Sequence, residues 1–180
     1  LIKACGDDVV EFLQGQLTND IKLVNENSGQ LSAYCNPKGR ILANFRIFKR
    51  DESYYLSLSS DISEATLKRL RMFVMRSKVE LVDYSDEFSR MGIAGKNAPQ
   101  ALSSFFKNIP QNTDDSCTEN GVTLIKVAGT LPRYEAYGIF DDLKELWLSL
   151  QSDAVAIGEN SWNLLTIRAA IPKIVSQTVE

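Results

Sequence analysis

Two cationic side chains, Lys38 and Arg40, stand near the centre of the stretch AYCNPKGRILANFRIF. Lysine and arginine at such a place can bind the carboxylate or phosphate groups of a ligand. Pro37 suits the second position of a β-turn and Gly39 suits its fourth, so we expect a turn here. Beyond the turn, apolar and polar residues alternate with a period of two, which predicts a strand and hence a β-hairpin. The polar face of this strand is either exposed to solvent or a wall of a ligand site.

The residue types that the sequence lacks limit its chemistry. There is no histidine, which removes the commonest general base, the usual zinc ligands and any His-activated nucleophile. The three cysteines, Cys5, Cys35 and Cys117, have no CxxC spacing, and their odd number predicts reduced thiols rather than a disulfide framework. We interpret each as a small apolar filler rather than a metal or redox group. The sequence therefore predicts neither a metal site nor a catalytic residue.

Size and charge favour a globular protein with a small-molecule or protein partner. The 180 residues, 44% of them hydrophobic, suffice for one large domain or two small ones. The net charge of −3 argues against a general nucleic-acid surface, which usually needs a basic patch. No run of 18 apolar residues occurs, and the first residues lack a signal-peptide layout. We expect a cytoplasmic protein with no direct nucleic-acid or membrane partner.

Strands and helices are interleaved along the chain, and the pattern restarts near residue 86. Many expected strands are close enough in sequence to form hairpins, and few helices connect strands as regular βα units. We therefore predict an α+β fold of two small subdomains with mainly antiparallel sheets and flanking helices. The expected ranges are 1–85, 86–158, and a helix with an extended tail at 159–180. We expect the last helix to pack near the first subdomain. We expect Trp147 to be a core residue of an amphipathic helix.

Five segments resemble, in order, the YgfZ-type folate-binding proteins, which are relatives of the glycine-cleavage aminomethyltransferase, the T-protein. The segments are VVEFLQGQLTNDI, AYCNPKGRILANFRIFKR, TLKRLRMFVMRSKVELVD, PRYEAYG and WNLLTIRAAIPKI. The resemblance covers nearly the whole chain, and FLQGQLTND and AYCNPKGR are its most specific parts. In the family, a K-G-C-Y-x-G-Q-E motif and a C-terminal barrel are expected beyond the part that this chain matches.

The resemblance implies a T-protein-like fold, tetrahydrofolate or a derivative as cofactor, and a bacterial cytoplasmic location. Family members assist the maturation or repair of iron–sulfur proteins, including enzymes that modify tRNA. The implied partners are therefore folate and iron–sulfur proteins or their assembly factors.

The resemblance also implies which residues bind folate. Trp162 lines up with a tryptophan that contacts folate, and its aromatic face suits a flat pterin. Glu135 lines up with a glutamate that holds the pterin, and Arg168 matches a T-protein arginine less securely. Alternatively, Trp162 is a core residue, and Glu135 and Arg168 are exposed to solvent. Lys38 and Arg40 could meet the anionic tail of folate or a partner protein, or only be solvated.

The hairpin departs from the T-protein at Ala43 and Asn44. The T-protein carries an acidic pair there, and its aspartate is central to aminomethyl transfer. Because Asn44 cannot ionise, it cannot act as a base or stabilise a developing cation as a carboxylate would. We expect Asn44 to line a folate site that does not perform glycine cleavage. Two alternatives remain: a folate-dependent aminomethyltransferase, and a non-catalytic interaction module with a vestigial pocket.

Overall fold

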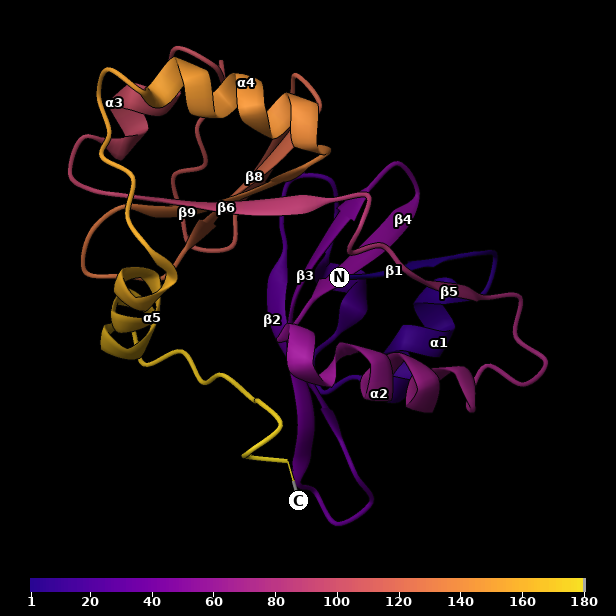
Figure 1. The fold of residues 1–180 in the computed structure, drawn as a ribbon. Coiled ribbons are helices and arrows are strands. Elements are labelled where there is room, and N and C mark those ends of the chain that lie inside the picture. Colours follow the sequence, from indigo (N-terminus) through magenta and orange to yellow (C-terminus); the bar gives the residue numbers. More distant parts are fainter. Residues whose placement is uncertain (180) are drawn as a thin grey trace. The chain divides into compact units, whose positions relative to one another are not determined.

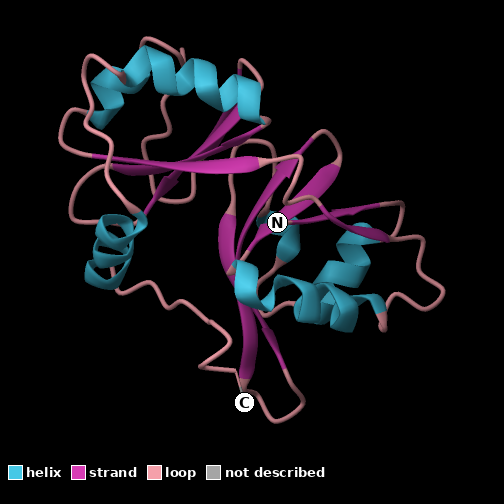
Figure 2. Cartoon of the chain, in the orientation of Figure 1, coloured by secondary structure: helices cyan, strands magenta, loops and turns pink. Residues whose placement is uncertain are grey.

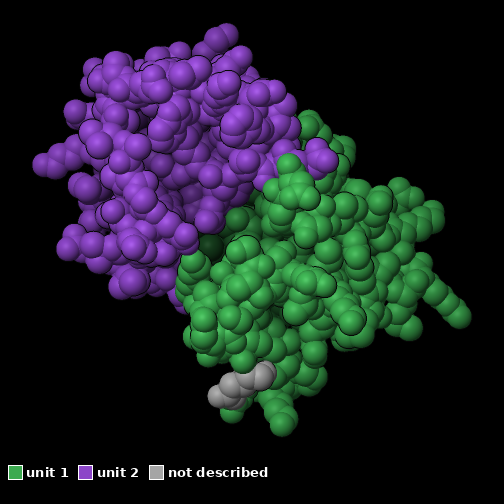
Figure 3. All heavy atoms as spheres, in the orientation of Figure 1, with its two compact units in different colours: residues 1–86, 173–180 green, residues 87–172 purple. Residues whose placement is uncertain are grey.

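The structure is a computed structural model that describes residues 1–179. Two compact units make up the chain (Figure 3). The first contains residues 1–86 together with the tail from Lys173 onward, and the second contains residues 87–172. Each unit holds an antiparallel sheet with flanking helices, which confirms the α+β fold class. The tail and the last helix, which we expected as one segment at 159–180, belong to different units.

The first unit is built on a five-stranded antiparallel sheet in the order β2-β3-β4-β1-β5 (Figure 1). Its elements are β1 (Ile2–Cys5), α1 (Val9–Gln16), the short 3₁₀ helix η1 (Ile21–Leu23), β2 (Gln30–Cys35), β3 (Ile41–Arg50), β4 (Ser53–Ser57), α2 (Ser60–Arg71) and β5 (Glu80–Asp83). The β2–β3 hairpin is present, and its turn is closed by a 2.9 Å hydrogen bond from the Gly39 N–H to the Asn36 carbonyl. Gly39 has φ +77°, a conformation that favours glycine.

The core of the first unit lies between one face of this sheet and the two α-helices. Ala43, Phe45 and Ile47 point into it from β3, as the period of two predicts. Leu13 of α1 and Leu70 of α2 close it from the other side, and both are fully buried. The opposite face of β3 therefore carries Asn44 and Arg46, as the alternation requires.

The second unit is built on a four-stranded antiparallel sheet in the order β6-β9-β8-β7. Its elements are β6 (Ser89–Ala94), α3 (Ala98–Leu102), β7 (Ser116–Glu119), β8 (Val122–Val127), β9 (Arg133–Gly138), α4 (Phe140–Leu150) and α5 (Glu159–Arg168). Helices α3 and α4 lie on one side of this sheet, and α5 lies on the other (Figure 1, Figure 2). Leu102, Leu124 and Leu146 are fully buried in the core between the sheet and the helices α3 and α4.

Two sequence-based expectations about the second unit were wrong. Trp147 is 45% exposed rather than core, because the buried stripe of α4 runs through Leu143, Leu146 and Leu150 and leaves Trp147 at its margin. The last helix, α5, groups with the second unit, and its expected closeness to the first stays a prediction. Strand β7 lies within the segment IPQNTDDSCTENG, whose polar residues predict a loop.

Within residues 1–179, no helix is long and apolar enough to cross a bilayer.

Candidate functional site

A row of polar side chains follows the face of the second sheet that α3 and α4 do not cover. On β9, Arg133, Glu135 and Tyr137 alternate with the core residues Tyr134 and Ala136 and therefore share this face. Their partners on the neighbouring strand β6 are Ala94, Gly92 and Arg90, respectively. Directly opposite residues on paired strands lie about 4.5–5.5 Å apart at Cβ, so these six positions form one continuous patch.

Glu135 is held in this patch by its neighbour on the same strand. The Tyr137 hydroxyl, from a side chain that is 1% exposed, donates a 2.6 Å hydrogen bond to Glu135 Oε2. Arg90 stands opposite Tyr137 on the neighbouring strand. Desolvation by burial disfavours the charge of the Arg90 guanidinium, but the interactions with Tyr137 and Glu135 outweigh this effect, so the pKa of Arg90 is raised. The Glu135 carboxylate is thus positioned by a rigid aromatic hydroxyl and lies beside a cation.

Trp162 of α5 lies directly on the backbone of β6. A Cβ atom built on Gly92 would come within 2.6 Å of two carbons of the indole ring, so only glycine leaves room for the ring here. The Arg133 guanidinium stacks on the same ring, with its central carbon 4.3 Å from the ring centroid. Such a cation–π contact is worth roughly 0.5–2 kcal/mol. Because Gly92 is the register partner of Glu135, the ring and the carboxylate are neighbours.

Arg133 attaches α5 to the sheet. Its side chain is 1% exposed and donates to the Ala128 carbonyl, the Leu165 carbonyl and the Thr166 hydroxyl at 3.1, 3.0 and 2.9 Å. Helix α5 itself has no buried residue. Its position therefore depends on polar contacts with Arg133 and on the contact between Trp162 and Gly92, rather than on an apolar stripe.

The structure brings together two of the residues that the sequence suggested for folate binding, Glu135 and Trp162. Arg168 lies at the exposed C-terminal end of α5, six residues after Trp162 and about 9 Å from it along the helix axis. The sequence did not single out Arg133, Tyr137, Arg90 or Gly92. The period of two in RYEAYG places Arg133 and Tyr137 on the face of Glu135 and was a signal for both.

The other suggested residues belong to the first unit. Lys38 and Arg40 are exposed at the hairpin tip, where their backbone N–H groups donate to Asn36 Oδ1 at 2.9 and 3.0 Å. Ala43 is fully buried in the core. Asn44 Oδ1 accepts a 2.9 Å hydrogen bond from the backbone N–H of Ile174 in the tail. Asn44 is therefore a residue that anchors the returning tail on β3.

Among residues 1–179, no group of three or more metal-binding side chains was found. The three cysteines are free thiols, and burial raises the pKa of Cys117 to about 11.

Residues 2–128 match the family model described as the GCVT N-terminal domain. The chain belongs to this family. The match begins in the first unit, continues through β8 of the second, and includes the β2–β3 hairpin.

Curated relatives of this GCVT-domain chain are named tRNA-modifying protein YgfZ. The protein of Hamiltonella defensa is 32% identical over 177 residues, which make up 97% of this chain and 52% of the relative. The protein of Photorhabdus laumondii is 32% identical over 174 residues, with the same two coverages. The chain therefore spans about half the length of these relatives.

A solved structure has the same fold. The glycine cleavage system aminomethyltransferase T of Bartonella henselae superposes with a TM-score of 0.72 over 84% of this chain and 43% of its own. The two sequences are 15% identical, so the likeness concerns the fold. It confirms the T-protein-like architecture that the sequence motifs predicted.

Proposed function

We propose that this GCVT-domain chain binds a reduced folate, tetrahydrofolate or a derivative, and acts in the manner of a YgfZ-type protein that supports tRNA modification. The observation that carries the proposal is the placement of Glu135 beside Trp162 on the polar face of the second sheet. The family match and the names of the relatives support the same function.

The chemistry of a pterin fits these two side chains. A pterin is flat and presents two neighbouring N–H donors, N3–H and the 2-amino group, which a carboxylate can accept together. In the proposed complex Glu135 accepts these bonds while Tyr137 holds its Oε2, and the indole of Trp162 contacts the ring system. Stacking contributes about 0.5–1.5 kcal/mol beyond burial. The charge-assisted hydrogen bonds contribute roughly 1.5–3 kcal/mol.

The anionic tail of folate requires cations. Arg168 is proposed as a contact for the glutamyl carboxylates, because it is exposed at the end of the helix that carries Trp162. Lys38 and Arg40 are proposed separately as contacts for an anionic group or a partner protein. Asn44, in the first unit, is likewise proposed separately as a contact for folate through its side-chain amide.

The cellular role proposed is support of iron–sulfur cluster assembly or repair, with an indirect effect on tRNA modification. This part rests on the sequence resemblance and on the names of the relatives. The role is tested in a bacterial strain that lacks its own YgfZ and carries the full reading frame that encodes this chain. The measurement is the activity of the iron–sulfur enzymes that modify tRNA in that strain. Unchanged tRNA modification in such a strain would contradict the proposed role but not folate binding.

Folate binding is tested by titration of the chain with tetrahydrofolate under anaerobic conditions, followed by calorimetry and tryptophan fluorescence. We expect Glu135→Gln to weaken binding about tenfold or more, because one accepting oxygen becomes a donor. Trp162→Phe should remove most of the fluorescence change, whereas the control Trp147→Phe should keep it. Binding that survives Glu135→Gln unchanged, a fluorescence change that follows Trp147, or an absence of binding would contradict the site.

A further inference from the structure

The second sheet has an open edge at β6. Strand β6 pairs with β9 on one side and is the first strand in the order β6-β9-β8-β7. The Gly95 N–H donates to the Pro132 carbonyl at 3.0 Å, so this N–H points toward β9. Because these directions alternate along a strand, Ile93 and Met91 also bond toward β9. The N–H and C=O groups of Gly92 and Ala94 therefore point away from the sheet.

No described residue pairs with these outward groups of Gly92 and Ala94. Open edges of this kind are usually covered, charged or shortened, because they act as templates for another strand. Here the edge runs along a pocket instead of facing plain solvent. The backbone of β6 therefore offers a short row of alternating donors and acceptors to whatever enters that pocket.

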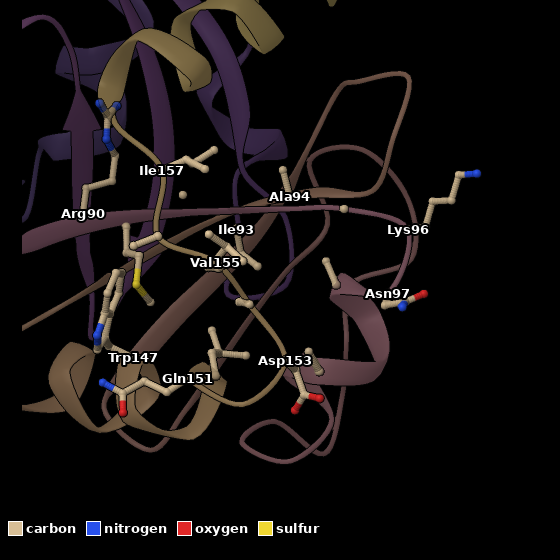
Figure 4. A pocket seen from close by; sticks show the side chains of 18 residues that line it. Arg90, Ile93, Ala94, Lys96, Asn97, Trp147, Gln151, Asp153, Val155 and Ile157 are labelled. Carbon is tan, nitrogen blue, oxygen red and sulfur yellow. The ribbon is translucent and has the colours of Figure 1, made fainter.

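The pocket has a volume of about 740 Å³ and lies within the second unit. Its lining joins β6 to the C-terminal end of α4 and to the segment 151–157 that follows (Figure 4). Trp147, Val155 and Ile157 line it with 45%, 88% and 59% of their surfaces exposed. Ligand-binding pockets usually measure about 300–1,000 Å³. This one combines an apolar wall with an unpaired strand edge.

The segment that follows α4 does not complete the sheet. Residues 154–157 have no regular secondary structure, and among the described residues the N–H groups of 155–157 make no backbone hydrogen bond. Figure 4 shows Val155 near Ile93, so the segment passes along the pocket without pairing with β6. Its two large apolar side chains remain uncovered, which is costly unless another molecule packs on them.

Charge adds a further constraint on the occupant. Lys96 stands where the chain leaves β6, and no ion pair to it is found within residues 1–179. Arg90 stands at the opposite end of the strand, beside Glu135 and Tyr137. The pocket also holds one carboxylate, Asp153, on the side of α4. The two ends of the strand are thus basic, and its middle is apolar.

We propose that this pocket binds an extended peptide segment of a partner protein, which adds a strand to β6. The peptide exchanges backbone hydrogen bonds with Gly92 and Ala94, places apolar side chains against Trp147, Val155 and Ile157, and carries carboxylates toward Lys96 and Arg90. Strand addition of this kind takes its affinity from main-chain hydrogen bonds and its specificity from alternate side chains. The pocket shares Arg90, Gly92 and Ala94 with the patch that holds the folate site proposed above, but the inference does not depend on that function.

Hydrogen exchange of individual amides, followed by NMR, tests the proposed pairing in the unmodified chain. The probe is a peptide of sequence Glu-Val-Thr-Val-Thr-Val-Glu with blocked ends. At saturation we expect exchange at the Gly92 and Ala94 amides to slow at least about tenfold. Exchange at the Gly95 amide, which is already bonded to Pro132, should stay unchanged. Equal slowing at all three amides, or slowing at none, would overturn the proposal.

Two N-methylated versions of the peptide provide a matched control for the backbone ladder. One carries methyl groups on its second and fourth amides, and the other on its third and fifth. Because a strand presents alternate amides to its neighbour, one version should bind at least about tenfold more weakly and the other nearly as well as the parent. Equal affinity of the two versions would show that the peptide does not pair with β6.

Two pairs of surface variants test the side-chain contacts. Trp147→Ala should weaken binding about tenfold, while Leu148→Ala, at the next exposed position outside the pocket, should not. Lys96→Glu should weaken binding, while Lys144→Glu, an exposed lysine of α4 outside the pocket, should not. No difference within either pair would overturn the proposal. A further control measures the exchange of the Gly92 and Ala94 amides without peptide. If their protection rises with protein concentration, the edge pairs with a second copy of the chain, and this result would also overturn the proposal.

Discussion

The backbone N–H of Ile174 donates a 2.9 Å hydrogen bond to Asn44 Oδ1 and joins the tail to the middle of β3. A second bond, from the Ser176 N–H to Asp61 Oδ2 at 2.8 Å, joins the tail to the first turn of α2. Ile174 and Val179 also pack against the core of the first unit. Asn44, which the sequence resemblance matches to a carboxylate of the T-protein, thus has a structural task in this chain.

Replacing Asn44 by alanine should loosen the tail. The substitution removes the acceptor of the hydrogen bond from the Ile174 N–H. Such a bond contributes about 0.5–1.5 kcal/mol to stability, so its loss should make exchange of the Ile174 amide about two- to tenfold faster. Asn44→Asp is the matched control, because a carboxylate also accepts this bond and should preserve protection. Hydrogen exchange by NMR measures both. Unchanged protection in the alanine variant would contradict the role of Asn44.

Glycine cleavage should not occur with this chain. By the sequence resemblance, Ala43 and Asn44 stand where the T-protein has its acidic pair, and neither provides a carboxylate to balance a developing positive charge. Folate-dependent ammonia release in the presence of the usual partner proteins should equal the rate without this protein. Release well above that rate would show that another group supplies the charge.

Replacing Arg133 by methionine should detach α5 from the sheet. The change removes the Arg133 donor from the carbonyls of Ala128 and Leu165, of which Leu165 keeps only the Ala169 N–H, and it removes the stacking on Trp162. Hydrogen bonds to charged groups are worth about 1.5–3 kcal/mol each, so amide exchange throughout α5 should rise more than tenfold. Arg168→Met, at the exposed end of the same helix, is the control and should leave exchange nearly unchanged. A protected α5 in Arg133→Met would mean that another contact holds the helix.

The contact between Asp61 and the tail should be lost only in strong acid. The Ser176 N–H, together with hydroxyls of Ser59 and Ser176, lowers the pKa of Asp61 from 3.8 to about 2. A folded-state pKa below the unfolded value means that the stabilisation is complete above about pH 4 and disappears as the pH falls toward 2. The NMR shift of the Ser176 amide should titrate with a midpoint near pH 2, and Asp61→Asn should abolish this titration. A midpoint near 3.8 would show that the hydrogen bond does not form.

Cys117 should react slowly with alkylating reagents. Burial, assisted by the nearby Glu119 carboxylate, raises the pKa of its thiol to about 11, so only about one thiol in a thousand is ionised at pH 8. The alkylation rate of Cys117, measured by peptide mapping, should keep rising between pH 8 and pH 10. The same measurement in the unfolded chain serves as the reference and should level off near pH 9. A native rate that levels off there would contradict the effect of burial.

Local patterns predicted much of the fold. The turn at Pro37 and Gly39 and the alternation in RILANFRIFKR predicted the β2–β3 hairpin, because turn chemistry and strand period are local properties. Strand β7 was missed because it has four residues and only a partly buried face. A signal was present: Asn120 and Gly121 have φ of +50° and +75° and form the two-residue turn to β8. An Asn-Gly pair favours such a hairpin.

The candidate site was less predictable, because it depends on packing between distant segments. The contact between Trp162 and β6 requires the absence of a side chain at Gly92, which no pattern in α5 reveals. The docking of α5 through the buried Arg133 was equally hidden, since hydrophobic periodicity detects apolar stripes and this helix has no buried residue. The resemblance to a family, rather than periodicity, pointed to Glu135 and Trp162.

The return of the tail to the first unit has a consequence for the order of folding during synthesis. A ribosome releases residues 1–86 before the second unit, yet the side chains of Asn44 and Asp61 receive Ile174 and Ser176 only after the whole second unit has been made. The second unit is one continuous segment and can fold as soon as it emerges, because domains generally fold as units. The unit that is synthesised first is therefore the last to be completed.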